Sequence, residues 1–357
     1  MLSVLSSCGG SDAGNAESEA KKILVVGRFG TTLGRFRQTR AVGVEDDGSF
    51  YVVDRTGRVQ YFARDGQLLA YWSMPEFKYG QPVGIEVEGP NTVLVSDSHY
   101  QRIRRYRAMS KVLASGQPQP VEGGAVSKDG AVSKDGAVSK DGAVSKNGAD
   151  VPRFESAELE LLSWGSQGKG GGEFRFVRDV VKDSKGFVYA GDYGGLNDRV
   201  QKFTSKGEFV REFGGRGVEH GQFDHPAGME IERRGESEFL LVSDCNNHRL
   251  QRFDLDGNFV AAWGELGTEV GQLRYPRSVA IDPQGRIVVC EWGNNRLQRF
   301  DKDGRSLGVY GTAGREPGQF LTPWDVEVGR DGTIYVADYG NHRVQVFAWP
   351  DSAIDTK

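Results

Sequence analysis

The feature that most constrains this chain of 357 residues is an internal repeat that occurs six times. Each copy holds a short apolar run, a turn, a second run ending in an acidic residue, and a third run with an Arg near its start and an aromatic residue at its end. The acidic residue falls at Asp54, Asp97, Asp192, Asp244, Glu291 and Asp338. Similar units of this length stack against one another, because one unit cannot bury its own apolar faces.

Each unit consists of four short β-rich runs separated by hairpin signals. Asp-Gly pairs stand between the first two runs, as at 331–332, and between the last two, as at 303–304. Glycine supplies the positive φ that two-residue hairpin turns require. A unit is therefore predicted to be a four-stranded antiparallel meander, and six of them predict an all-β, six-bladed β-propeller.

The amino-acid motif of the repeat is specific to one family of repeats. Its clearest copy reads Pro-Gly-Gln-Phe-Leu-Thr-Pro at 317–323, Val-Ala-Asp at 336–338 and Asn-His-Arg-Val-Gln-Val-Phe at 341–347. These motifs resemble the NHL repeat, and the resemblance covers nearly all of residues 21–350. The last unit stops after its third strand, whereas residues 23–27 match the outer strand of other units. The N-terminal strand is thus expected to complete the last blade and close the ring.

The rest of the chain consists of tails and one insertion. Residues 1–20 are expected to form a disordered tail or the remnant of a lipoprotein signal, and 351–357 a C-terminal tail. An insertion at about 108–155 separates the third and fourth strands of blade two. It repeats Gly-Ala-Val-Ser-Lys-Asp, a composition that buries little and is typical of a mobile low-complexity loop.

The N-terminus carries a targeting signal of its own. Leu5-Ser6-Ser7-Cys8 resembles a bacterial lipobox, although the stretch before Cys8 is too short for a signal peptide unless translation starts farther upstream. We expect an exported protein of the bacterial cell envelope, lipid-anchored at Cys8; a cytoplasmic protein with a Ser/Gly-rich tail is the alternative. Cys245 and Cys290 are expected to be small buried residues and not a disulfide.

Positions that differ between units are the best candidates for a binding site. The loop before the first strand and the loop after the second open on the same face of a propeller, beside its channel. The residue after the Pro-equivalent position of that first loop is Arg40, Val83, Arg178, Ala227, Arg277 and Trp324 in blades one to six. Arginines from alternate blades with an aromatic neighbour suit an anionic ligand or an acidic peptide. The alternative is that each Arg neutralises a nearby acid such as Asp179, Asp325 or Glu291.

Features common to all units are better explained by structure. The acids that end the second strands are expected to accept hydrogen bonds from turn N–H groups and to pair with the Arg of the following Asn-His-Arg. Of the histidines only His225 adjoins a Pro-equivalent position, so the zinc ligands of an NHL-related lyase for hydroxyglycine peptides cannot be carried over. We predict no catalytic residue, no metal ligand and no particular cofactor.

Together these features favour a monomeric, non-enzymatic binding propeller that presents its Arg-bearing face to a protein or a small anionic ligand. A metal-dependent lyase or hydrolase in the channel, similar to the peptidyl-hydroxyglycine lyase or to propeller lactonases, is the first alternative. An RNA-binding NHL domain is the second, disfavoured by the net charge of -4. Membrane contact is expected only through a lipid anchor.

Overall fold

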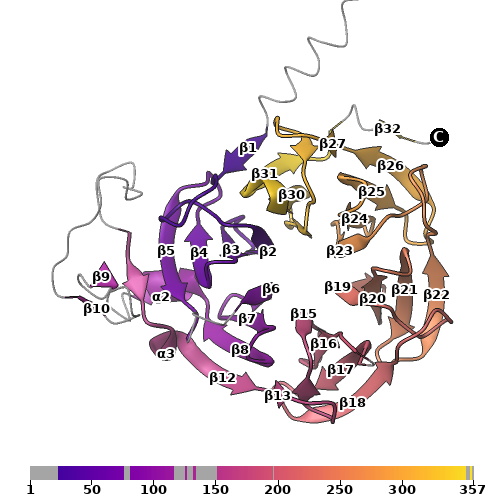
Figure 1. Cartoon of the computed structure of the whole chain (residues 1–357), viewed down its shortest axis with the longest axis horizontal. Coiled ribbons are helices and arrows are strands. Elements are labelled where there is room, and N and C mark those ends of the chain that lie inside the picture. Colours follow the sequence, from indigo (N-terminus) through magenta and orange to yellow (C-terminus); the bar gives the residue numbers. More distant parts are fainter. Residues whose placement is uncertain are drawn as a thin grey trace, which may run out of the picture.

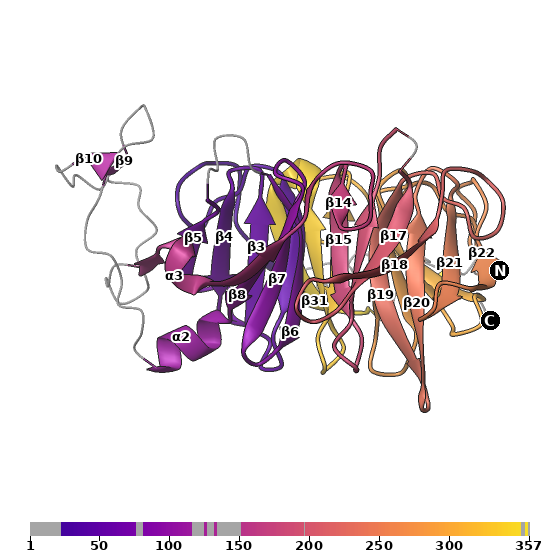
Figure 2. The ribbon, with the colours of Figure 1, turned by 90° about the horizontal axis from the view of Figure 1, so that it is seen from below.

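The chain folds as a ring of six antiparallel sheets around a central axis (Figure 1). The computed structural model describes residues 23–75, 81–115, 125–126, 132–133, 151–195, 197–350 and 354–355. Seen from the side, the strands of each sheet run up and down between two faces of a short cylinder (Figure 2). The predicted six-bladed β-propeller is confirmed.

The first three blades follow one another along the chain, each with its first strand innermost. Blade one comprises β2 (Thr39–Val44), β3 (Phe50–Asp54), β4 (Arg58–Phe62), β5 (Leu68–Ser73) and, parallel to β5, β11 (Arg153–Phe154). Blade two comprises β6 (Pro82–Gly89), β7 (Thr92–Asp97), β8 (Arg102–Arg107) and β12 (Glu160–Trp164). Blade three comprises β15 (Val177–Lys182), β16 (Val188–Asp192), β17 (Arg199–Phe203) and β18 (Phe209–Gly214).

The last three blades repeat this arrangement. Blade four comprises β19 (Pro226–Arg234), β20 (Ser237–Asp244), β21 (Arg249–Asp254) and β22 (Phe259–Trp263). Blade five comprises β23 (Pro276–Ile281), β24 (Ile287–Glu291), β25 (Arg296–Phe300), β26 (Ser306–Tyr310) and β32 (Ile354–Asp355). Blade six comprises β29 (Asp325–Val328), β30 (Thr333–Asp338), β31 (Arg343–Ala348) and β1 (Leu24–Val26), with the 3-10 helix η1 (Tyr339–Asn341) between β30 and β31. The fifth strands of blades one and five were not predicted.

The N-terminal strand closes the ring as predicted. β1 pairs antiparallel with β31, so that Leu24 faces Val346 and Val26 faces Val344. Val26 is buried in a cluster that joins blade six to blade one. Strands from the two ends of the propeller thus share one sheet, which removes an open edge from the ring.

The insertion joins the third and fourth strands of blade two, as expected, because β12 pairs with β8. Its two ends are structured, which corrects the expectation of a plain loop from about residue 108. Helix α2 (Met109–Ser115) buries Met109 and Val112, and the Met109 N–H donates to the Tyr51 hydroxyl over 2.7 Å. Helix α3 (Ser156–Leu159) buries Leu159. Between the two helices the structure describes the short strands β9 (Ala125–Val126) and β10 (Val132–Ser133) and the segment 151–155, which contains β11.

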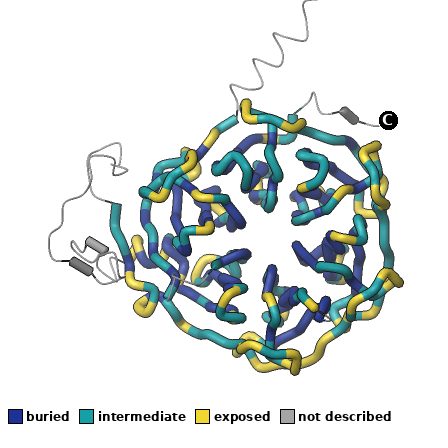
Figure 3. Tube along the Cα trace, in the orientation of Figure 1, coloured by how far each residue is buried: buried dark blue, intermediate teal, exposed yellow. Residues whose placement is uncertain are grey.

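The apolar core lies between neighbouring blades. The second strands are mostly buried, and β3, β16 and β24 are buried along their whole length. One cluster, for example, packs Ala280 and Val288 of blade five against Val326 and Val336 of blade six. Figure 3 shows burial concentrated in the inner strands and exposure on the loops and the outer rim. Stacking between blades therefore buries the apolar surface that one sheet leaves open.

The acids that end the second strands are structural, as predicted. Asp338 accepts hydrogen bonds from the side chains of Asn341, Arg343 and Gln345 at 2.8 to 3.1 Å. The same Arg–acid pairs form in blades three, four and five. In blades one and two, Asp54 and Asp97 accept backbone N–H groups of the preceding loops and following turns.

Two short parallel strand pairs lie in loops between blades. They are β13 (Ser166–Gln167) with β14 (Glu173–Phe174), and β27 (Thr312–Ala313) with β28 (Gln319–Phe320). Cys245 and Cys290 are free and buried, as predicted, and Cys8 lies outside the described residues. In the part of the chain that the structure describes, no helix has the length and apolar character needed to cross a bilayer.

Candidate functional site

The structure brings together all four residues singled out at the channel mouth. Arg40, Arg178 and Arg277 stand at the start of β2, β15 and β23, the innermost strands of blades one, three and five. Trp324 directly precedes β29 of blade six. The four side chains line one small cavity of about 10 Å³, which is room for about one water molecule. We call these four residues the arginine mouth.

The arginines of the mouth are poorly satisfied. Within the described residues Arg178 has no hydrogen-bond partner for its side chain, although only 5% of it is exposed. Arg40 donates from Nη2 to Gln81 Oε1 over 2.8 Å, and Arg277 Nη1 lies 3.3 Å from His225 Nε2. The Nε atoms of Arg40 and Arg277 are buried without a partner. Buried donors of this kind are costly unless a ligand or water accepts from them.

Trp324 holds two of the guanidinium groups in place. The guanidinium carbon of Arg277 lies 3.9 Å from the centre of the Trp324 ring, and that of Arg178 lies 4.6 Å from it. The ring also stacks on Tyr339 with centroids 4.4 Å apart. Cation–π contacts of this kind offset part of the repulsion between like charges without neutralising them.

The electrostatics of the mouth reflect this crowding. Burial and, next to it, the charge of Arg277 lower the pKa of Arg178 to about 9. Burial likewise lowers the pKa of Arg40. Burial and the charge of Arg277 lower the pKa of His225 to about 3, so its ring is neutral at pH 7. The mouth therefore concentrates positive charge that an anion would relieve.

Arg199, in the same blade as Arg178, shows what a structural arginine looks like in this fold. It is equally buried, but it pairs with Asp192 and Glu212 and donates to the carbonyl oxygens of Lys169, Gly170 and Glu173. Arg249, Arg296 and Arg343 make the corresponding contacts in blades four to six. The arginine mouth lacks this network among the described residues.

The acids proposed as neutralising partners are engaged elsewhere. Glu291 pairs with Arg296 at 2.7 Å. Asp179 accepts from the Met229 N–H at 2.7 Å, and Asp325 accepts from the Val42 N–H at 2.9 Å. Each of these two carboxylates thus ties its own inner strand to that of the next blade. Burial raises the pKa of Asp179 to about 7 and that of Asp325 to about 6.

Glycine keeps the channel narrow at the level of these two carboxylates. A Cβ on Gly228 would lie 2.5 Å from the backbone Cα of Ser278 in the next blade. A Cβ on Gly84 would lie 2.9 Å from Asp179 Oδ1 and 3.0 Å from the carbonyl oxygen of Arg178. The inner strands approach so closely here that larger residues would force the blades apart.

The opposite end of the channel is acidic. Glu86, Glu230 and Glu327 come from blades two, four and six, three positions after the mouth position of each blade. They line a cavity of about 290 Å³. Burial raises the pKa of all three, to about 8 for Glu230, and neighbouring carboxylates raise it further. Sequence reasoning missed this set, which the same blade-to-blade comparison would have found.

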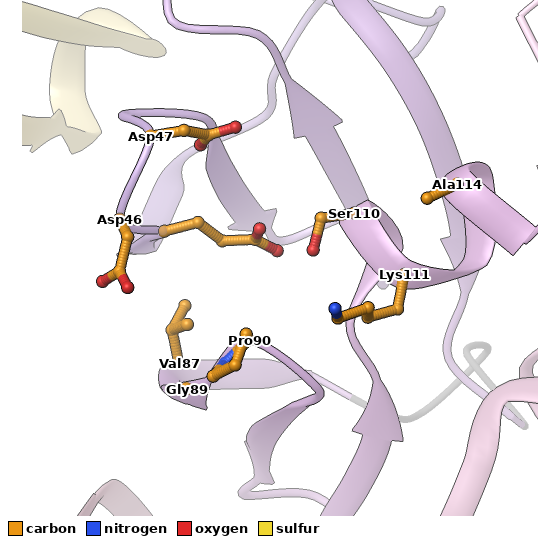
Figure 4. Close-up of a pocket in the computed structure, with 9 residues that line it drawn as sticks. Asp46, Asp47, Val87, Gly89, Pro90, Ser110, Lys111 and Ala114 are labelled. Atoms are coloured by element: carbon orange, nitrogen blue, oxygen red, sulfur yellow. The ribbon is translucent and has the colours of Figure 1, made fainter.

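A further hollow of about 250 Å³ lies beside that acidic end, between blades one and two and helix α2. Figure 4 shows Lys111 reaching from α2 into this hollow, across from the β2–β3 turn that carries Asp46 and Asp47. Over the described ranges, no three or more His, Cys, Asp or Glu side chains have the arrangement of a metal site.

Two of the blades match a known repeat. Residues 273–300 and 320–347, in blades five and six, match the NHL repeat, and the other four blades show the same order of strands and turns. This chain is an NHL-repeat β-propeller. A comparison with curated proteins finds no significant relative.

Solved structures similar to this NHL propeller have diverse functions. Virginiamycin B lyase from Staphylococcus aureus is 13% identical, with a TM-score of 0.54 over 92% of this chain and 99% of the other. A putative gluconolactonase is 14% identical, with a TM-score of 0.53 over 90% and 91%. The WD40 propeller domain of Doa1 is 13% identical, with a TM-score of 0.52 over 92% and 98%. At these identities the likeness shows the fold alone.

Proposed function

We propose that this NHL propeller is a non-enzymatic binding protein whose arginine mouth receives a small anionic group of its ligand. The observation that carries the proposal is the contrast between two sets of arginines. Those of the repeated motif have carboxylate and carbonyl partners, whereas Arg178 and its neighbours have no carboxylate partner in the described part of the chain.

A carboxylate or phosphate group would supply the hydrogen-bond acceptor and the negative charge that this site lacks. It would accept from the unpartnered guanidinium N–H groups and lower the repulsion among the arginines. The cavity of about 10 Å³ has room for no more than one water-sized group, so only an oxygen of the anionic headgroup would enter it and the rest of the ligand would lie on the surrounding face. The two carboxylates beneath the mouth, Asp179 and Asp325, would keep the anion from passing deeper into the channel.

Thermal unfolding with simple anions tests this proposal. Glutarate, citrate and pyrophosphate are added at constant ionic strength, with chloride as the balancing anion. We expect at least one of them to raise the Tm of the wild type by several degrees, because a ligand that binds only the folded state stabilises it. Arg178→Gln should lose most of that rise.

Arg330→Gln is the matched control for this experiment. Arg330 lies at the acidic end of the channel, is 78% exposed at its side chain and pairs with Asp46. Its substitution removes the same charge and should leave the anion effect intact. Equal rises in wild type and Arg178→Gln, or no rise with any anion, would contradict the proposal.

The rival proposals are separated by two other measurements. A metal-dependent lyase or hydrolase would retain stoichiometric metal after purification in metal-free buffer. An RNA-binding NHL domain would bind single-stranded RNA with an affinity that falls steeply with salt. Neither is expected of a propeller that receives one small anionic group.

Export with a lipid anchor at Cys8 extends the proposal to the location of the protein. Cys8 follows Leu5-Ser6-Ser7 in a lipobox-like order. Mass spectrometry of the membrane fraction should find a diacylglyceryl group on this cysteine, and Cys8→Ser should release the protein from that fraction. Recovery of the unmodified wild type in the cytoplasm would show that the tail has another role.

A further inference from the structure

The face that carries the arginine mouth also exposes large apolar side chains. Loops that lead into the inner strands, and loops after the second strands, all lie on this face because the strands alternate in direction. On blades three to five these loops carry an arc of apolar and aromatic residues. We call it the apolar arc: Phe176, Tyr193, Val218, Leu266, Tyr275 and Trp292.

Four members of the arc are exposed to a degree that is unusual for their type. Phe176, Trp292, Leu266 and Val218 are between 37% and 69% exposed. They come from four different loops, so the exposure is not the result of one protruding segment. Apolar side chains gathered on one face in this way mark binding surfaces more often than chance exposure does.

Ring contacts connect the arc to the arginine mouth. Phe176 lies 5.4 Å from Tyr193, and Tyr193 lies 3.9 Å from His225, measured between ring centroids. His225 in turn contacts the guanidinium group of Arg277. On the other side, Trp292 packs edge-on against Tyr275 at 5.5 Å, two residues before Arg277. The two aromatic pairs of the arc, Phe176 with Tyr193 and Tyr275 with Trp292, therefore flank the mouth at Arg277.

We propose that the apolar arc and the arginine mouth together dock a segment of a partner polypeptide that places an Asp or Glu carboxylate at Arg277 between apolar side chains. This inference rests on the proposed anion-binding function and names its partner. Aromatic residues and arginines supply most of the binding energy in protein interfaces, and the central charge with its apolar surround matches that composition.

The chemistry of the arc favours a polypeptide over RNA. Nucleobases stack on aromatic rings and guanidinium planes. Val218 and Leu266 offer them no such surface, whereas both suit aliphatic or aromatic side chains of a partner. The small cavity at the mouth has room for an oxygen of one acidic group and not for the successive phosphates of a strand.

Selection from a random peptide library tests this inference on the full chain. Twelve-residue peptides displayed on phage are panned on the wild-type protein, and enriched peptides are synthesised for fluorescence polarisation. We expect enriched sequences to contain Asp or Glu within two or three residues of apolar side chains. Their Kd should rise about tenfold or more in Arg277→Gln, the size expected for losing a buried charged contact.

Surface variants separate the arc from the mouth. Phe176→Ala and Trp292→Ala should each raise the Kd about fivefold or more, as for hot-spot aromatics. The Tm should fall by only a few degrees, because each ring is more than a third exposed and packs on one neighbouring ring. Val260→Ala removes an equally exposed apolar side chain from the outer strand of blade four and should change nothing.

Three outcomes overturn the inference. In the first, the library yields no enriched peptide. In the second, the enriched peptides bind the Phe176→Ala and Trp292→Ala variants as tightly as the wild type. In the third, these substitutions weaken the binding of RNA and not of peptides. If simple anions still stabilise the wild type and not Arg178→Gln, only this inference fails. If those anions also have no effect, the proposed function fails with it.

Discussion

Arg178→Met offers the sharpest distinction between a binding and a structural role for the arginine mouth. Methionine keeps an unbranched stem against Trp324 but removes the charge. Burial lowers the pKa of Arg178 by more than three pH units from its usual value, to about 9. At about 1.4 kcal/mol per pH unit, the folded protein carries a penalty of about 5 kcal/mol for holding this charge. The group is protonated at pH 7 in both the folded and the unfolded state, so the whole penalty applies there.

The contact with Trp324 offsets part of that penalty. A desolvated cation–π contact contributes about 2 kcal/mol, and the shorter side chain loses some packing. We therefore expect Arg178→Met to raise the free energy of unfolding by about 1–3 kcal/mol in a buffer without multivalent anions. In a protein of this size that corresponds to several degrees in Tm. Urea unfolding and thermal melts measure it directly.

Arg199→Met is the matched control, because Arg199 has the same burial in the same blade. Its loss leaves Asp192 without its ion pair and frees the carbonyl oxygens of the loop before blade three. We expect it to lower the free energy of unfolding by about 3–5 kcal/mol. A destabilisation above about 1.5 kcal/mol for Arg178→Met would refute the reasoning, because it exceeds the loss of an ordinary hydrogen bond.

Three further predictions concern the scaffold. Deleting residues 1–27 should lower the Tm by more than about 5 °C, because β1 and its buried Val26 are lost. Deleting residues 1–19 should leave the Tm unchanged. Equal Tm values for the two truncated proteins would contradict ring closure. Replacing residues 117–150 by a short Gly-containing turn, which spares α2, should leave the Tm within a few degrees of the wild-type value. The reason is that the entropy of loop closure changes only with the logarithm of loop length. Aggregation of the shortened protein would show that the segment packs on the blades. Burial raises the pKa of Glu230 to about 8, so its stabilising effect is complete below about pH 4.5 and lost as pH rises through 8. Glu230→Gln should therefore stabilise by about 1–3 kcal/mol at pH 8.5 and by much less at pH 5, and an equal effect at both values would refute this origin.

Much of the fold could be predicted from the sequence because the six blades repeat the same arrangement of strands and turns. The turn glycines, the acid at the end of the second strand and the Arg–acid pair recur in register, so each copy supports the reading of the others. The structured ends of the insertion could not be read this way. Helix α2 begins where the Met109 N–H donates to Tyr51 of blade one, and β11 pairs with β5 of the same blade. Both contacts join residues far apart in the sequence, so no local sequence pattern predicts them.

The sequence predicted where the residues of the candidate site lie, but not which hydrogen bonds and ion pairs they form. Comparing one position across six blades placed Arg40, Arg178 and Arg277 at the same mouth, because equivalent positions in a propeller converge on its axis. Whether they pair with acids depends on side-chain directions. Asp179 follows Arg178 in the chain, but its carboxylate accepts a backbone N–H of the next blade instead, at a point where the strand pairing is irregular.

A crystal structure with para-bromobenzoate bound tests the central claim most directly, because the anomalous signal of bromine locates the molecule and the electron density then orients its carboxylate. The predicted result is one bromine peak on the face of the apolar arc, with the carboxylate within hydrogen-bond distance of Arg178 and Arg277 at the arginine mouth. The peak should be absent from crystals of Arg178→Gln soaked in the same solution. Peaks only at exposed arginines elsewhere, or a mouth in which each arginine pairs with a carboxylate of the protein, would contradict the account.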